Sequence, residues 1–187
     1  MRNPRILTAT WLLAALALGL TARGDSIAEL KPSQVIQLDG QVLLNQVPVV
    51  SSVALDPAGR MLVTAGDDHL VRLWDARAGS MQRQLAGHSD WVRVAAFSPD
   101  GQVLATAGDD GIIQLWSVSS TRPYRTLSAH EASVQALAFS PDNHLLAAAG
   151  SDNQVRVYDG RRGALVRTLE APGPDVRALL FSPGGRQ

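Results

Sequence analysis

The 187-residue chain contains 45% hydrophobic and 18% charged residues, a composition typical of a folded globular protein rather than a disordered one. Its 17 basic and 17 acidic side chains balance, which gives no electrostatic reason to expect nucleic acid or an anionic membrane as a partner. Cysteine is absent from the sequence, and this excludes disulfides, thiolate metal sites, a cysteine nucleophile and an acylated lipoprotein cysteine.

The N-terminal residues 1–24 are predicted to be an export signal. Arg2 and Arg5 begin it, and residues 6–20 form an uncharged run rich in Leu and Ala. A membrane span needs about 20 apolar residues, so this shorter run favours a signal peptide, cleaved after Gly24. The alternative is an uncleaved anchor formed by residues 6–20. Both predict an extracytoplasmic protein, periplasmic or secreted, and the Ala- and Arg-rich composition favours a bacterial source.

The rest of the chain repeats itself without a gap, at the constant spacing that separates Trp74 from Trp116. After a linker and lone strand at 25–45, the predicted repeats are 46–86, 87–128 and 129–170, with a partial repeat at 171–187. When the repeats are aligned, the positions that recur at this spacing are Trp74, Trp116 and Tyr158; Gly66, Gly108 and Gly150; Asp68, Asp110 and Asp152; and Phe97, Phe139 and Phe181. A repeat of this length indicates an array of similar small units.

Each unit is predicted to form four short strands. In the second unit the strands are 92–97, 103–107, 112–116 and 124–127. Ser98-Pro99-Asp100-Gly101 has the residues of a tight turn between the first two strands. No segment has apolar residues at helical spacing, so the fold class is all-β. A four-stranded unit of about 40 to 45 residues has the size of a propeller blade.

The sequence resembles the WD-repeat family in four features, which the second unit has in full and the other units have in part. The second unit has Gly87-His88, the turn Phe97-Ser98-Pro99-Asp100-Gly101, Asp110 and Trp116, and the first unit has Trp74-Asp75. This resemblance covers residues 35–187 and implies a segment of a WD40 β-propeller: about three four-stranded blades plus the first strand of a fourth.

In that family a His, a Ser or Thr, an Asp and a Trp of each blade form a buried hydrogen-bond network. The resemblance carries this network onto three sets of side chains: His88, Thr106, Asp110 and Trp116; Thr64, Asp68 and Trp74; and His130, Asp152 and Tyr158. The set of the first unit lacks a histidine because Gln46 takes its position, and the set of the third unit has Ala148 in place of the hydroxyl. In the partial repeat Pro172 falls at the histidine position, so no network is expected there.

Catalytic and metal sites are not predicted. His88-Ser89-Asp90 has the letters of a catalytic triad, but three adjacent residues cannot converge on one substrate. The pairs Asp67-Asp68 and Asp109-Asp110 recur in tight turns and lack the clustered oxygen ligands of a Ca²⁺ loop. We therefore expect no cofactor and no metal, and a structural role for these residues.

The predicted ring is incomplete, because propellers have about four blades or more. Val176 to Phe181 is predicted to be the first strand of a fourth blade, and residues 33–44 supply the outer strand of a preceding one. Three explanations stay open: a fragment of a longer propeller protein, a ring completed by self-association through the open blade edges, or an open array. We favour the fragment.

Fold alone does not define function. The resemblance implies a non-catalytic scaffold that binds other proteins, which are not identified by the sequence. The alternative is the propeller portion of an enzyme whose catalytic groups lie in other blades or in a fused domain. Such an enzyme would show unrepeated His, Asp or Glu at loop positions facing the central channel, and the visible repeats show none.

Overall fold

The computed structural model describes residues 48–187 with the exception of 129, 172, 174 and 185–187. These residues belong to a compact unit spanning Gln34–Gln187. The predicted export signal at 1–24, the linker and lone strand at 25–45, and Gln46 lie outside the described residues. Within the described part of the chain, no helix is long and apolar enough to cross a membrane.

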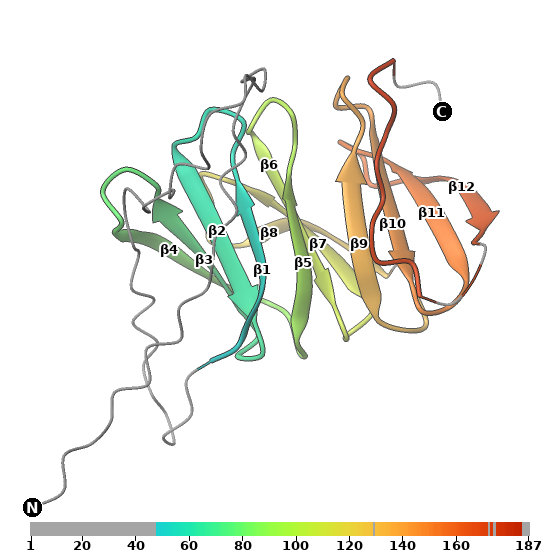
Figure 1. Ribbon diagram of the computed structural model, residues 1–187, viewed down its shortest axis with the longest axis horizontal. Coiled ribbons are helices and arrows are strands. Elements are labelled where there is room, and N and C mark those ends of the chain that lie inside the picture. Colours follow the sequence, from blue (N-terminus) through green and yellow to red (C-terminus); the bar gives the residue numbers. More distant parts are fainter. Residues whose placement is uncertain (1–47, 129, 172, 174, 185–187) are drawn as a thin grey trace, which may run out of the picture. The chain divides into compact units, whose positions relative to one another are not determined.

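Three antiparallel sheets of four strands make up the described chain, which confirms the all-β prediction (Figure 1). The strand order is β1-β2-β3-β4, β5-β6-β7-β8 and β9-β10-β11-β12, so each sheet is a simple meander. The first blade contains β1 (Val50–Leu55), β2 (Met61–Gly66), β3 (Leu70–Asp75) and β4 (Met81–Ala86). The second contains β5 (Val92–Phe97), β6 (Val103–Gly108), β7 (Ile112–Ser117) and β8 (Pro123–Ser128). The third contains β9 (Val134–Phe139), β10 (Leu145–Gly150), β11 (Gln154–Asp159) and β12 (Leu165–Glu170).

The turn between the first two strands of a blade is fixed by side-chain hydrogen bonds to the backbone. In the second blade Ser98 Oγ accepts a hydrogen bond from the Val103 amide at 2.9 Å and donates one to Asp100 Oδ1 at 2.6 Å. Gly101 adopts φ +69°, which a residue with a Cβ rarely does. The Ser-Pro-Asp-Gly motif therefore sets where the first strand ends and the second begins.

The repeated glycine at the end of the second strand is required by a close backbone approach. A Cβ on Gly108 would collide with the carbonyl oxygen of Trp91, and the same contact joins Gly66 to Val49. At this point the β5–β6 register shifts between Val92 and Val94, as expected for a β-bulge. The glycine column thus lets the chain entering each blade pass directly against the second strand.

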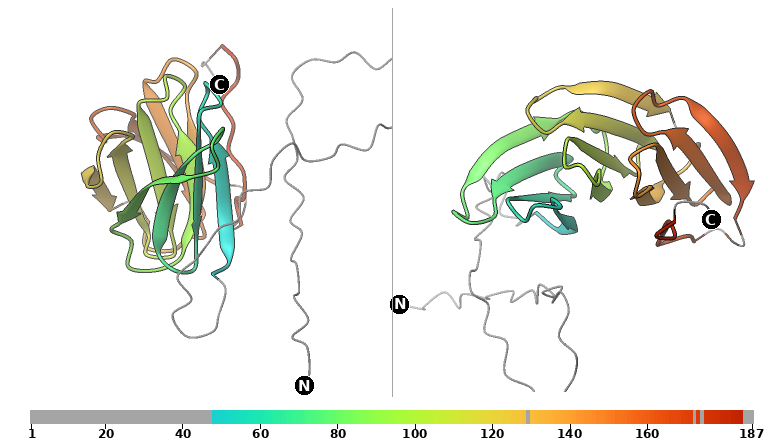
Figure 2. Two further views of the ribbon diagram at one scale, coloured as in Figure 1. Left: turned by 90° about the vertical axis from the view of Figure 1, so that its left-hand side faces the viewer. Right: turned by 90° about the horizontal axis from the view of Figure 1, so that it is seen from above.

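The three blades stand side by side, and their first strands β1, β5 and β9 contact one another in chain order (Figure 2). Apolar side chains fill both spaces between blades. Trp116 is fully buried between the first and second blades, and Ile113 and Leu115 are fully buried between the second and third. Burial of the period-two apolar faces therefore stabilises the blades against each other rather than singly.

The predicted first strand of a fourth blade is not formed. Val176 to Phe181 has no regular secondary structure, and Leu180 within it is 93% exposed. A first strand takes its ladder hydrogen bonds from the second strand of the same blade, and no described residue supplies that second strand. The apolar pattern of residues 176–181 is that of a first strand, but the pattern alone does not provide the second strand with which it would pair.

Candidate protein-docking surface and the networks beneath it

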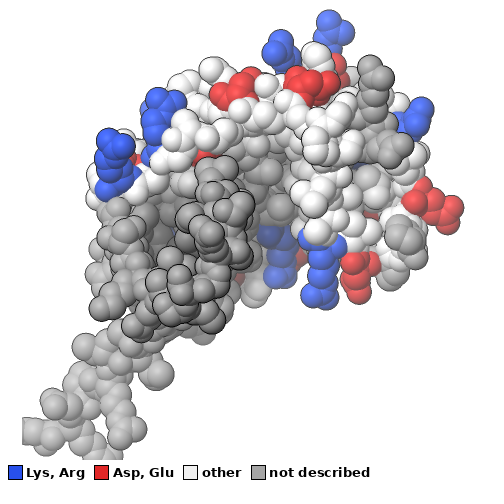
Figure 3. Space-filling view, turned by 45° about the horizontal axis from the view of Figure 1, so that its top comes forward, with Lys and Arg blue, Asp and Glu red and all other residues white. Residues whose placement is uncertain are grey.

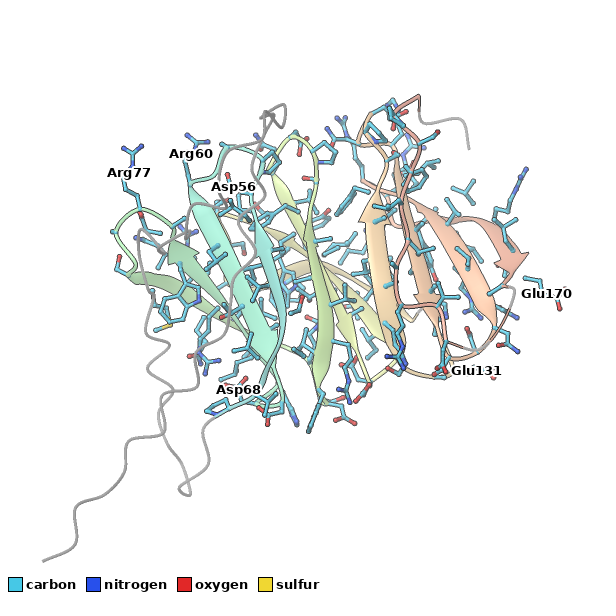
Figure 4. All side chains as sticks on the ribbon, viewed as in Figure 1. Asp56, Arg60, Asp68, Arg77, Glu131 and Glu170 are labelled. Atoms are coloured by element: carbon cyan, nitrogen blue, oxygen red, sulfur yellow. The ribbon has the colours of Figure 1, made fainter. Side chains whose placement is uncertain are left out.

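One end of the blades is formed by the turns β2–β3, β6–β7 and β10–β11, and we call it the Asp-turn end. Its turns contain residues 67–69, 109–111 and 151–153. The segments that lead into β5 and β9 lie beside these turns, since the Asp109 amide donates to Trp91 O at 2.9 Å and the Ser151 amide to Ser133 O at 3.0 Å. Figure 4 shows Asp68 and Glu131 at this end, and Arg60 and Arg77 at the opposite one.

In the second blade the structure brings all four network residues together. His88 Nδ1 lies 2.7 Å from Asp110 Oδ2, and His88 Nε2 lies 2.8 Å from Thr106 Oγ1. Trp116 Nε1 donates to the same Thr106 oxygen at 2.8 Å. Because a carboxylate only accepts, Nδ1 carries the imidazole proton, and Nε2 accepts from the threonine hydroxyl. The hydrogen bonds therefore all point the same way, from Trp116 through Thr106 and His88 to Asp110. Each of these buried groups has a hydrogen-bond partner.

The first blade contains part of the same arrangement. Trp74 Nε1 donates to Thr64 Oγ1 at 2.9 Å, as in the second blade. Asp68 instead lies 2.6 Å from Arg72 Nη2 and accepts from the Leu70 amide at 3.2 Å. The side chain of Asp68 is 20% exposed, so its charge is partly solvated as well as paired.

The third blade has a different network around His130, which occupies the same repeat position as His88. His130 Nδ1 lies 2.9 Å from Asp152 Oδ1, and Arg156 Nη1 lies 2.5 Å from Asp152 Oδ2. Ala148 offers no hydroxyl, and no described residue is a hydrogen-bond partner for the buried Nε2 of His130. Tyr158, at the tryptophan position, is 4% exposed and packs in the core between the second and third blades.

Burial and charge shift the acid–base balance of this third network. Burial lowers the pKa of His130, although the hydrogen bond to Asp152 acts in the opposite direction. Burial alone would raise the pKa of Asp152, but hydrogen bonds from Arg156 and His130 outweigh it and lower that pKa. The neutral imidazole and the charged carboxylate are therefore the favoured forms, with Arg156 supplying the compensating charge.

The acidic pairs in the turns accept hydrogen bonds from backbone amides. Asp110 Oδ1 accepts from the Ile112 amide at 3.1 Å, and Asp67 Oδ1 accepts from the Val49 amide at 2.8 Å. Within the part of the chain that the structure describes, no three His, Asp or Glu side chains gather in a way that could hold a metal ion.

Trp91, Arg93 and Asp109 form an exposed cluster on the Asp-turn end of the second blade, which was not predicted from the sequence. Trp91 is 37% exposed, and the Arg93 guanidinium lies 4.4 Å from the centre of its ring. Asp109 holds Arg93 through its Nε at 2.9 Å and also accepts from Ser133 Oγ of the third blade at 2.6 Å. Hydrogen bonding between Arg93 and Asp109 raises the pKa of the arginine and lowers that of the aspartate.

The signal for this cluster in the sequence is a break in the repeat. The positions equivalent to Trp91 in the first and third units hold Val49 and Ser133, and those equivalent to Arg93 hold Ser51 and Gln135. Neither Trp91 nor Arg93 is therefore required by the blade, since the other two blades form without them. A comparison of repeats for exposed residues that do not recur could have found the cluster.

The surface charge is mixed rather than of one sign. The side of the molecule seen in Figure 3 shows arginine and acidic side chains interspersed. At the Asp-turn end Asp90 and Glu131 are exposed, whereas Arg72, Arg93 and Arg156 are each paired with an aspartate. This end therefore presents an exposed tryptophan together with the exposed acidic side chains of Asp90 and Glu131.

Four-stranded meanders that pack side by side through their first strands define the chain as part of a β-propeller. A family model described as WD domain, G-beta repeat matches residues 35–75, 79–117 and 121–159, more than half of the chain. The chain belongs to the WD40 repeat family.

Comparison with single proteins gives partial matches. The chain is 49% identical over 39 residues to the nuclear distribution protein PAC1 of Coprinopsis cinerea, which is 21% of this chain and 9% of that protein. Among solved structures it resembles the WD40 repeats of RRP9, with a TM-score of 0.68 at 25% identity, over 71% of this chain and 42% of that one. The structure of U3-55K gives a TM-score of 0.65 at 24% identity, over 67% of this chain and 40% of that one. The chain thus spans less than half the length of either solved structure.

Proposed function

We propose that this chain is a non-catalytic scaffold that binds another protein at the Asp-turn end, with Trp91 as the anchor. WD40 repeat proteins typically mediate protein–protein interactions, which supports the general class. The observation that carries the specific proposal is an exposed tryptophan that the repeat does not require, stacked on an arginine that Asp109 holds in place. Tryptophan and arginine are the residues that most often dominate binding energy at interfaces.

The partner chemistry follows from the charges around Trp91. Arg93 is neutralised by Asp109, whereas Asp90 and Glu131 have exposed side chains. A segment that carries basic side chains next to an apolar or aromatic one would satisfy both the acidic groups and the indole face. The hydrogen bond from Ser133 to Asp109 links the second and third blades at this point, and it helps to hold Asp109 and its partner Arg93 in place before a partner binds.

Site-specific photo-crosslinking in an extract of the source cells tests this proposal. A photoreactive residue at position 131, on the Asp-turn end, is compared with one at position 77, on the opposite end (Figure 4). We expect a discrete crosslinked protein from position 131 alone. Trp91→Ala should abolish it, whereas Tyr124→Ala, which removes an aromatic side chain of 46% exposure from the outer strand β8, should not. Equal crosslinking from both ends, or crosslinking unaffected by Trp91→Ala, would contradict the assignment.

We also propose that the chain is exported and that its three blades form part of a closed ring. The apolar run at 6–20 between basic residues and a small-residue cleavage site supports export. The intact mass of the protein from its own source tests both points. A mass equal to residues 25–187 indicates cleavage, and the full 187-residue mass in the membrane fraction indicates an anchor. A larger mass supports the prediction that these residues are a fragment of a longer propeller protein.

A further inference from the structure

The end of the molecule opposite the Asp-turn end is formed by two turns of each blade. In the first blade these turns are residues 56–60, between β1 and β2, and residues 76–80, between β3 and β4. The Ala76 amide donates to the Arg60 carbonyl at 2.8 Å, which holds the two turns side by side. The equivalent contact is present in the other two blades. The repeat therefore places Arg60 and Arg77 on neighbouring turns at this end.

A surface hollow of about 360 Å³ lies at these two turns, and we call it the Arg60–Arg77 hollow. It is lined by Ala58, Gly59, Arg60, Asp75, Arg77 and Ala78. Both arginines are exposed, and Figure 4 shows their side chains projecting outward from this end. Among the residues that the structure describes, no carboxylate lies within ion-pair distance of either guanidinium. The hollow thus presents the N–H donors of two guanidinium groups to an acceptor from outside.

Two carboxylates belong to these turns, and the backbone already binds both of them. Asp56 is 5% exposed, and its Oδ1 accepts hydrogen bonds from two backbone amides at 2.5 and 2.6 Å. Asp75 Oδ1 accepts from the amides of Arg77 and Ala78 at 2.9 and 2.7 Å. The amide dipoles partly offset the two negative charges. Neither aspartate therefore takes the place of an external partner for the guanidiniums.

The first blade lacks an exposed carboxylate that the other two blades have at this end. The positions equivalent to Ala58 hold Asp100 and Asp142, and both side chains are exposed. In the third blade Asp142 lies 3.1 Å from His144, which occupies the position of Arg60. The first blade instead has its turn carboxylate two residues earlier in the chain, where it is buried. The internal partner that the third blade supplies at this position is thus absent from the first blade.

The exposure of the two arginines does not depend on the blades that lie on either side. The second blade has a neighbour on both sides, yet Gln102 and Ser119, its counterparts of Arg60 and Arg77, are exposed. That pair is uncharged, and in the third blade one member of the pair is His144, next to its aspartate. Of the three described blades, the first alone has arginine at both positions.

We propose that the Arg60–Arg77 hollow is a second docking site, which binds a segment of a partner protein that carries neighbouring Asp or Glu side chains. Guanidinium groups match the geometry of carboxylates through paired N–H donors. The small residues Ala58, Gly59 and Ala78 allow a peptide backbone to approach closely. A doubly charged phosphate inside the hollow would meet the carboxylate of Asp75, whereas carboxylates on an extended segment contact each guanidinium from outside.

This site is separate from the surface around Trp91, which lies at the opposite end of the molecule, and it does not depend on the docking role of Trp91. The two sites prefer segments of opposite charge, so one copy of the chain can bind two different partners at the same time. A photoreactive residue at position 77 replaces one of the two guanidiniums, so no crosslink through the hollow is expected from that position.

An NMR titration of the full chain with an acetylated and amidated hexaglutamate peptide tests the proposal. We expect amide shifts confined to residues 58–60 and 75–78. Arg60→Gln and Arg77→Gln should each raise the dissociation constant about 2- to 5-fold, as expected for the loss of one exposed ion pair, and the double variant about 10-fold. Arg122→Gln is the matched control, because this exposed arginine belongs to the β7–β8 turn at the same end, and it should bind as the wild type does.

Ala58→Asp gives the sharpest test, because it restores the carboxylate of the other two blades beside Arg60. It should weaken binding at least as much as Arg60→Gln does. Thr121→Asp adds the same charge at an exposed position of the second blade at this end and should have little effect. The amide spectrum of each variant without peptide establishes that it folds, which is expected because these side chains are exposed.

Three results would overturn the proposal. The first is the absence of shifts at residues 58–60 and 75–78 when the peptide is added. The second is equal weakening by Ala58→Asp and Thr121→Asp, which would show a general effect of net charge. The third is that inorganic phosphate, at equal ionic strength, produces the same shifts at a lower concentration than the peptide, which would make the hollow a phosphate site. None of these results bears on Trp91, whose own test uses the opposite end.

Discussion

The second and third blades share one strand plan but differ in their buried polar groups. Their strands begin and end at equivalent positions of the repeat, and both pair in the same register. Three substitutions separate their networks: the third blade has Ala148 in place of Thr106, Arg156 in place of Gln114 and Tyr158 in place of Trp116. The hydrogen-bonded chain from Trp116 to Asp110 in the second blade becomes an ion cluster with Arg156 in the third.

This difference indicates what each part of the repeat does. The blade forms with or without the complete network, so apolar packing between blades and the turn motifs are sufficient for the strand arrangement. The network then adds stability and fixes side-chain positions at the Asp-turn end, where it lies directly below the exposed surface. We expect the second blade to be the more stable of the two, and four experiments test this comparison.

The largest effect is expected from Trp116→Ala. This side chain is fully buried, so its removal leaves a cavity and also takes away the donor to Thr106, at a cost of about 3–5 kcal/mol in the free energy of unfolding. Tyr158→Ala in the third blade should cost less, because the residue removed is smaller and its blade has no such hydroxyl acceptor. Urea unfolding followed by circular dichroism measures both variants. A loss below about 1 kcal/mol for Trp116→Ala would show that the tryptophan is not a central part of its blade.

The next effect is expected from Thr106→Ala, which gives the second blade the residue of the third. The change leaves His88 Nε2 and the indole N–H of Trp116 without their partner, at a cost of about 1–3 kcal/mol. Thr126→Ala, on the exposed outer strand β8, is the control and should be near neutral. Hydrogen exchange of the β6 and β7 amides locates the effect, and equal loss of protection in all three blades would contradict a local network.

The sequence allowed the second-blade network to be placed because all four of its residues have fixed positions in one repeat. Arg156 was not assigned a role, since its counterparts are Arg72 and Gln114 and only the three-dimensional structure shows it next to His130 and Asp152. The Trp91 and Arg93 cluster could not be predicted from the repeat, because neither residue recurs in the other two units. Residues 176–181 have the apolar pattern of a strand but do not form one, because a strand also needs a pairing partner, and no local sequence pattern can specify that partner.

A gain of stability is expected from Ala148→Ser, which gives the third blade a hydroxyl near the unpartnered Nε2 of His130. A hydrogen bond to this nitrogen should stabilise the blade by about 1 kcal/mol. Serine adds a single oxygen to a fully buried position, so the strain of overpacking stays small. Ala149→Ser, at the adjacent buried position, is the matched control and should destabilise. Slower exchange of the β10 amides in Ala148→Ser alone is the expected result, and loss of protection in both variants would contradict the role given to Nε2.

The smallest effect is a pH dependence confined to the third blade. Burial lowers the pKa of His130 below its ordinary value of 6.5, so between these two pKa values the unfolded chain binds a proton that the folded chain does not. The free energy of unfolding should therefore fall as the pH falls below about 6.5. His130→Gln removes this titration and should flatten the profile between pH 7 and 5. Exchange of the β10 and β11 amides measured across this range reports the effect directly. An unchanged slope in His130→Gln would mean that a group other than the third-blade histidine controls the acid sensitivity.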